Sequence, residues 1–443
     1  MPVRAQTPTV GRMSLPTSLA AVLLLTATAA TSQVITDDTG NTSDPIITSV
    51  NGVMTVDNAQ TNNGIIFADA PLNVVENDGL SSANASATGN NLQGGNVGAD
   101  ANLHSTQTNA GRIVAQASVN GTNTGDEDLS LGTPVYATSQ AIANYQSGVT
   151  NGAHLTADTR QSSTADQVAA STHVTAPNNA IYISGEGDAT TVVNHTAYEV
   201  TNGRLDSKSW QSSDSEAHSN TSAIVHYSPS PNAYNAMATN NYYGAYSDDR
   251  GSQEHDITQT QSAMTQARAE VYAGNVWNMQ ANAAATGNDV NIQNAGGSMV
   301  VTNGQTQAGL VQSQAVIEAD EYGQVFATAS GIGNSLAAGN NDRYVRIDNN
   351  QLSSGGVDVI ASFDGNTGWD GYVTADAVGN SAIGYACSSC KADMGVNNTQ
   401  VNNSDVSATA TASVGRGRTI VSTAHATGNS ASYYVGNWLP LPD

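Results

Sequence analysis

The sequence predicts an all-β, elongated repeat protein of the β-solenoid or β-helix-like type, with about eight units of 46 to 53 residues. Three observations predict this fold class: a short tract recurs along the chain, small apolar residues alternate with polar ones inside it, and helical periodicity is nearly missing. A fixed period indicates one structural unit that is repeated, and not one pocket assembled from distant residues. We therefore expect the chain to make a long surface.

In the recurring tract, small apolar residues occupy every second position and the tract ends in Gly-Asn or a close relative. The clearest copies span residues 83–90, 281–288, 327–334, 373–380 and 422–429. We assign weaker copies to tracts that end at Ser139, Gly187 and Asn240. With these assignments the glycine position recurs at 89, 139, 187, 240, 287, 333, 379 and 428.

A glutamine follows the glycine position in the same register. The interval is 18 residues for Gln107, Gln305 and Gln351, and 21 residues for Gln261 and Gln400. Asn and Gln at matching positions of stacked layers form hydrogen-bonded ladders, so we expect these residues to be structural. The structural repeat residues that we predict are Gly89, Asn90, Gln107, Gly287, Asn288, Gln305, Gly333, Asn334, Gln351, Gly379, Asn380, Gln400, Gly428 and Asn429.

Each unit alternates with a period of two, as in residues 407–413, where Ala408, Ala410 and Ala412 share one face. Such alternation indicates a half-buried strand. Alanine is a weak strand former, so its dominance suggests strands packed closely against another backbone. Only residues 264–272 leave room for a helix. One unit holds about three or four strands, which fits one large coil, two smaller coils or a meander.

The chain divides into four regions. Residues 1–30 form a signal peptide, because Arg4 and Arg12 precede the apolar stretch 19–25 and the small residues 27–30; the true start is Met1 or Met13. Residues 31–80 are expected to be an N-terminal cap or lead-in. The β repeat array covers 81–435, and 436–443 is a C-terminal tail. We therefore expect an exported protein at the cell surface.

The composition excludes several classes of partner. Only 3 residues are Phe and 4 are Trp, and 11% are charged, against about 25% in an ordinary globular chain. The net charge is −24, and Lys208 and Lys391 are the only lysines. A nucleic-acid partner requires clustered Lys and Arg, so none is expected. Direct attraction to anionic lipid headgroups is equally disfavoured, and we expect membrane association only through partners.

The only two cysteines, Cys387 and Cys390, are expected to form one local disulfide in an exported chain. A redox-active pair would open a helix, and a zinc site would need a second ligand pair. We expect no catalytic residue and no cofactor. We predict a solvated turn at Glu318, Asp320 and Glu321. The loops 37–41 and 364–370 are the candidates for Ca²⁺, the one ion that we consider.

The leader, the Ala-Thr-Gly-Asn sequences at 87–90, 285–288 and 426–429, and the Gly-Asn-Ser sequences at 333–335, 379–381 and 428–430 resemble the holdfast anchor protein HfaD family of stalked alphaproteobacteria. That resemblance implies a non-enzymatic protein of cell adhesion. Such a protein works at the outer membrane with other holdfast-anchor proteins to tether the adhesive holdfast polysaccharide, with self-assembly as a further option. The alternative is a secreted β-helical carbohydrate-active enzyme or polysaccharide-binding protein, which would need carboxylates that converge in a groove.

Overall fold

A computed structural model describes the backbone of residues 46–50 and the whole of residues 52–125, 129–248, 250–342, 344–387 and 392–436. The predicted signal peptide, Lys391, Cys390 and residues 437–443 lie outside these ranges. Within them, we find no helix with the length and hydropathy needed to cross a bilayer.

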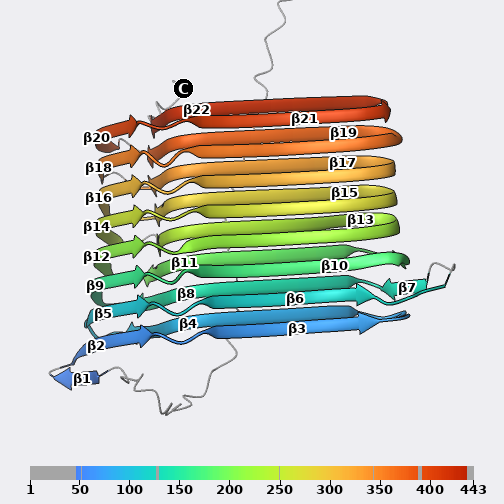
Figure 1. Ribbon diagram of the computed structural model, residues 1–443. Coiled ribbons are helices and arrows are strands. Elements are labelled where there is room, and N and C mark those ends of the chain that lie inside the picture. Colours follow the sequence, from blue (N-terminus) through green and yellow to red (C-terminus); the bar gives the residue numbers. More distant parts are fainter. Residues whose placement is uncertain are drawn as a thin grey trace, which may run out of the picture. The chain divides into compact units, whose positions relative to one another are not determined.

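The repeat array is a stack of parallel coils, and each coil follows the same path (Figure 1). A short strand comes first, a longer strand then continues to one end, and the chain turns there and runs back. We call these three parts the short strand, the outgoing leg and the return leg. Each part pairs in parallel with the equivalent part of the next coil, so three ladders run through the stack.

The short strands form one sheet, which β1 extends by antiparallel pairing with β2. Its members are β1 (Ile46–Val50), β2 (Val53–Asn62), β5 (Ala101–Asn109), β9 (His154–Ser163), β12 (Arg204–Ser213), β14 (Ser252–Gln261), β16 (Ser298–Gln307), β18 (Tyr344–Ser353) and β20 (Asp393–Asn402).

The legs form the second sheet. Separate outgoing legs are β3 (Ile66–Val74), β6 (Ile113–Gly121), β10 (Gln167–Ile181) and β21 (Val406–Arg416), and separate return legs are β4 (Ser81–Val97), β8 (Val135–Asn151), β11 (Gly185–Thr201) and β22 (Thr419–Val435). Four long strands turn at their middle and supply both legs: β13 (Glu216–Ser247), β15 (Thr265–Asn294), β17 (Val311–Asn340) and β19 (Val357–Ala386). The small strand β7 (Leu129–Gly132) pairs with β10.

Three features of the prediction are now decided. The fold class is confirmed, and each repeat unit is one large coil, eight of which lie in the described ranges. The array begins earlier than predicted, because residues 53–74 pair in register with β5 and β6 as part of the first coil. The stretch 264–272 is mostly strand, since β15 starts at Thr265.

The interior contains two apolar strips. One lies between the outgoing and return legs and consists mainly of Ala and Val, with a few larger side chains such as Tyr234, Met279 and Phe363. The other lies between the short strands and the far half of the return legs, and it includes Leu205, Ile257 and Met299. The alternation of buried and exposed residues along every leg produces these strips directly.

Small side chains face one another across the first strip. On the return legs, Ala85, Ala189, Ala236, Ala283, Ala329 and Ala375 fall in one register column. On the outgoing legs, Ala115, Ala170 and Ala267 fall in another. Almost all of them are fully buried. The two layers can therefore approach closely, which explains why alanine prevails despite its weak strand propensity.

Several buried ionisable groups have displaced pKa values, and His195, whose pKa burial lowers to about 4, is one of them. Burial lowers the pKa of His255 to about 3 and raises the pKa of Asp289 to about 6. The neutral His255 ring is well accommodated, because Tyr243 Oη lies 2.8 Å from Nδ1 and Gln253 Oε1 lies 2.7 Å from Nε2. A proton added to Nδ1 would have no acceptor there except hydroxyl groups.

Acid is expected to destabilise the coils around His255. Its folded pKa lies below the unfolded value of about 6.5, so its contribution is present above pH 6.5 and is lost as the pH falls towards 3. Between pH 6.5 and 5.0 the loss amounts to about 2 kcal/mol. Urea titrations at pH 7.5 and 5.0 should show that acid costs the parent chain about 2 kcal/mol more than it costs His255→Gln, because His195 and Asp289 titrate in both proteins. Asp289 acts in the opposite direction, since its contribution is lost as the pH rises from about 4 to about 6. Identical pH profiles for parent and variant would contradict the assignment to His255.

Candidate functional site

The first recurring site is an asparagine ladder on the return legs. Each side-chain Nδ2 donates to Oδ1 of the asparagine one coil further on, at 2.7 or 2.8 Å. The ladder contains Asn90, Asn144, Asn194, Asn241, Asn288, Asn334, Asn380 and Asn429. Each Nδ2 up to Asn380 also donates to a backbone carbonyl of the next short strand, for example from Asn334 to Leu352. Both N–H groups of these amides are thereby satisfied.

The second site is a glutamine ladder on the short strands. Each Nε2 donates to Oε1 of the preceding glutamine at 2.7 or 2.8 Å. Its members are Gln60, Gln107, Gln161, Gln211, Gln259, Gln305, Gln351 and Gln400. The second N–H of each amide reaches a return-leg carbonyl, as from Gln305 to Ser335. The short strand and the return leg are therefore linked through side chains in every coil.

The two ladders run in opposite directions. The asparagine amides donate towards the C-terminal end of the stack, and the glutamine amides donate towards the N-terminal end. Most members of both ladders are fully buried. A buried amide that keeps all its partners costs little, whereas one that loses a partner costs about 1–3 kcal/mol. The ladders therefore require the coils to stack in one register.

The structure places all the repeat residues that we predicted in these columns or beside them, and it corrects the weaker copies. The residues that precede the ladder asparagines in the second and third coils are Ala143 and Val193, and not Ser139 and Gly187. Gln261 belongs to a neighbouring column with Gln307, and the ladder member of its coil is Gln259.

The members that we missed are Gln60, Gln161, Gln211 and Gln259, with Asn144, Asn194 and Asn241. Their spacing of 46 to 54 residues was the available signal.

The glycine position lies between a corner residue and a backbone carbonyl of the next coil. A Cβ on Gly379 would lie 2.5 Å from the Gly428 carbonyl oxygen and 2.9 Å from Asn402 Oδ1. The second and third coils carry Ala143 and Val193 at this position, and the corner residues of the coils that follow them are Ser163 and Ser213. The corner residue alone does not select glycine, because Gly333 also precedes a coil with a serine corner. The substituted glycines hide these repeats from a search for Gly-Asn.

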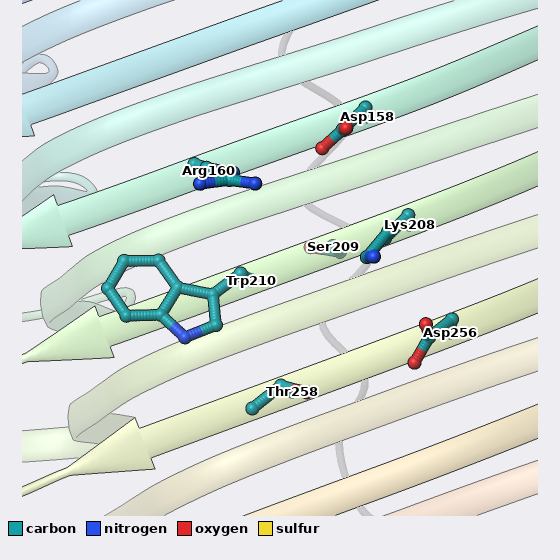
Figure 2. A pocket seen from close by; sticks show the side chains of 7 residues that line it. All are labelled: Asp158, Arg160, Lys208, Ser209, Trp210, Asp256 and Thr258. Atoms are coloured by element: carbon teal, nitrogen blue, oxygen red, sulfur yellow. The ribbon is translucent and has the colours of Figure 1, made fainter.

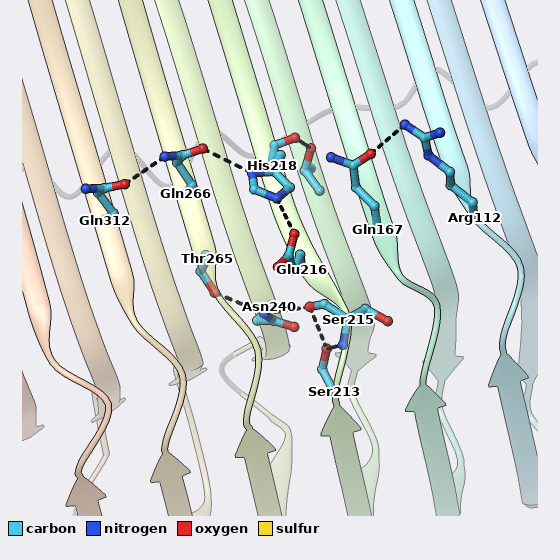
Figure 3. Close-up of polar contacts among 11 residues, drawn as sticks. Arg112, Gln167, Ser213, Ser215, Glu216, His218, Asn240, Thr265, Gln266 and Gln312 are labelled. Atoms are coloured by element: carbon cyan, nitrogen blue, oxygen red, sulfur yellow. Dashed lines mark hydrogen bonds and ion pairs between the residues drawn. The ribbon is translucent and has the colours of Figure 1, made fainter.

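Asn240 fills the glycine position of the fourth coil in another way (Figure 3). Its Nδ2 donates to Thr265 Oγ1 at 3.0 Å and to the Ser215 carbonyl at 3.3 Å, and so it binds the corner instead of avoiding it. Figure 3 also shows that polar side chains connect the outer faces of successive outgoing legs. Gln266 Nε2 donates to Gln312 at 2.7 Å, and the His218 ring contacts Gln266 at 3.1 Å.

The turn between the legs carries aromatic and charged residues. Trp277 and Trp369 lie two coils apart, yet their ring centroids are 5.3 Å apart. Gly323 lies between them, and a Cβ there would meet the Trp277 carbonyl oxygen at 2.3 Å. Arg418 lies 5.2 Å above the Trp369 ring and binds the Asp370 carboxylate with two nitrogens. This arrangement also holds the pKa of Asp370 below its usual range.

The structure shows where the residues lie for which we considered a chemical role. Asp370 of the loop considered for Ca²⁺ is bound by Arg418, and the other loop, 37–41, lies outside the described ranges. Glu318, Asp320 and Glu321 lie at the exposed turn of β17, where Glu321 accepts a hydrogen bond of 2.7 Å from Asn275. The described residues contain no group of three or more His, Cys, Asp or Glu side chains that could hold a metal ion. Cys387 is buried after β19 and is disulfide-bonded.

These features define a parallel β-solenoid protein with one large coil per repeat, in which two internal amide ladders hold the coils in register. The sequence profile of holdfast attachment protein D (HfaD) matches residues 75–356, which is 282 of the 443 residues. The chain therefore belongs to the HfaD family. No curated protein and no solved structure matches the chain.

Proposed function

We propose that this chain is a non-enzymatic structural protein of the cell surface that helps to anchor the adhesive holdfast polysaccharide to the outer envelope. The observation that carries the proposal is the family match, which covers most of the coil array. The architecture supports it, because every coil is joined to the next by backbone ladders and by two rows of side-chain amides. Such a stack is suited to transmitting tension along its length.

The proposal includes export of the chain, attachment to the outer membrane through other holdfast-anchor proteins, and contact with the polysaccharide. The strand edges at the two ends of the stack are suited to binding a protein partner. Within the described part of the chain, β20, β21 and β22 pair only on their N-terminal side, and β3 and β4 pair only on their C-terminal side. An unpaired strand edge is a template for further strands, from an anchor protein or from a second copy.

Deletion of the gene from the strain that carries it tests the proposal. We expect mutant cells to secrete adhesive polysaccharide but to shed it into the medium, because the attachment and not the synthesis is lost. The measurement is the polysaccharide in the cell-bound and medium fractions, with the complemented strain as control. The protein itself should fractionate with the envelope. If the deletion strain retains all of its adhesive material on the cells, an anchoring role is excluded.

A further inference from the structure

The outer face of the short sheet carries a shallow depression of about 270 Å³ across three coils (Figure 2). It is lined chiefly by Asp158 and Arg160 of β9, Lys208 and Trp210 of β12, and Asp256 and Thr258 of β14. These residues face outward because they alternate with the buried positions that carry the glutamine ladder. The side chains therefore belong to the surface and are not needed to close the interior.

The ring of Trp210 is exposed to solvent on this face. Its side chain is 41% exposed, and among the described residues it makes no ring–ring or cation–π contact. Trp277 and Trp369 are similarly exposed, at 50% and 51%, but they contact each other, and Arg418 lies over Trp369. Of these three tryptophans, only Trp210 makes no ring–ring or cation–π contact with a described residue.

The charges around Trp210 balance. Asp158, Lys208 and Asp256 are register neighbours in one row, and Arg160 and Thr258 flank Trp210 in the next. Two cations and two carboxylates give a formal sum of zero, on a chain whose net charge is −24. No ion pair joins these four groups in the described structure. Exposed donors and acceptors thus surround the Trp210 ring without being joined in ion pairs.

The same two rows carry different kinds of side chain in the next two coils of the sheet. The register places Thr302 and Gly304 of β16, and then Asp348 and Asn350 of β18, in line with Lys208 and Trp210. Neither coil contributes an aromatic or a cationic side chain to these rows. The arrangement around Trp210 is therefore local and is not a by-product of the repeat.

We propose that this depression binds an uncharged pyranose segment of a polysaccharide, with one sugar ring stacked on Trp210. The C–H face of a pyranose is apolar and packs on an indole ring. Its hydroxyl groups donate to the carboxylates and accept from Arg160 and Lys208 in charge-assisted hydrogen bonds. An anionic polymer is disfavoured because the depression has no net positive charge and the chain as a whole carries a net charge of −24. The inference rests on the proposed function and names the place of its polysaccharide contact.

Calorimetric titration of the full-length protein with four probes tests the inference: cellohexaose, mannohexaose, xylohexaose and hexagalacturonate. We expect at least one neutral hexasaccharide to bind more tightly than hexagalacturonate. Trp210→Ala should weaken that binding by about tenfold or more, as for the central aromatic residue of an interface. Lys208→Met should weaken it by a smaller factor, and Trp210→Phe should retain part of the affinity.

Trp277→Ala is the matched control, because it removes a tryptophan of similar exposure from another face, and its affinity should stay within about twofold of the parent. Unchanged circular dichroism of Trp210→Ala shows that the coil is intact. The inference is overturned if none of the neutral probes binds at millimolar concentration, if hexagalacturonate binds best, or if Trp210→Ala and Trp277→Ala behave alike. None of these results affects the shedding test, so the site and the anchoring role can fail separately.

Discussion

Asn334→Leu is expected to lower the free energy of unfolding by about 3–5 kcal/mol, because three groups lose their partner together. In the parent chain, Asn334 accepts from Asn288 Nδ2 at 2.8 Å and donates to Asn380 Oδ1 at 2.8 Å and to the Leu352 carbonyl at 2.9 Å. A leucine of similar size satisfies none of them, and all lie where water is excluded. Urea titration followed by circular dichroism measures the loss.

Asn429→Leu is the matched control for the ladder. Asn429 occupies the same position in the last coil, where it accepts from Asn380 but is itself exposed. Water can replace its side chain there, so we expect a loss of about 1 kcal/mol or less. Equal losses for the two variants would mean that the ladder contributes nothing beyond the individual amide, and the idea of a registered internal ladder would have to be abandoned.

Gly333→Ala is expected to destabilise the stack by about 2–3 kcal/mol through overpacking. The added Cβ would lie 2.5 Å from the Gly379 carbonyl oxygen and 3.2 Å from Gln307 Oε1. A backbone carbonyl in the next coil cannot withdraw without breaking the strand ladder. We therefore expect a lower urea midpoint and faster amide hydrogen exchange in β17 and β19 than in the parent chain.

Gly428→Ala tests the same position without the neighbouring coil. Its Cβ would approach nothing closer than the Asn402 side chain at 3.4 Å, which is ordinary contact. The change should be neutral or slightly stabilising, because alanine has less freedom in the unfolded chain. A result in which Gly428→Ala is as harmful as Gly333→Ala would show that the glycine serves local backbone conformation and not the approach of the next coil.

The sequence predicted the interior better than it predicted the boundaries. Alternating alanines indicated a closely packed β core, and the return legs have this core. The array starts at residue 53 and not at residue 81, because the legs of the first coil pair on one side only among the described residues and are not held to the composition of the inner coils. Its ladder residues, Gln60 and Asn90, nevertheless obey the common spacing.

The weaker repeats show how a local search fails. Ala143 and Val193 replace the glycine in the second and third coils, and Asn240 replaces it in the fourth, so these tracts no longer match the pattern. The asparagine that follows is present in every coil, so it is the better marker. From Asn90 to Asn380 its environment is the same, because each amide bonds to the next amide and to a backbone carbonyl.

The sequence by itself determined the β class, the length of the repeat and the small apolar interior, because every coil gives equivalent residues the same surroundings and so selects similar side chains. Only the tertiary structure decided that each repeat is one coil, which amides pair, and that Asp158, Lys208, Trp210 and Asp256 share one surface. Those neighbours lie about 50 residues apart in the chain, and the coils differ in length. Backbone pairing between coils brings such residues together, and no pattern within a single unit contains that information.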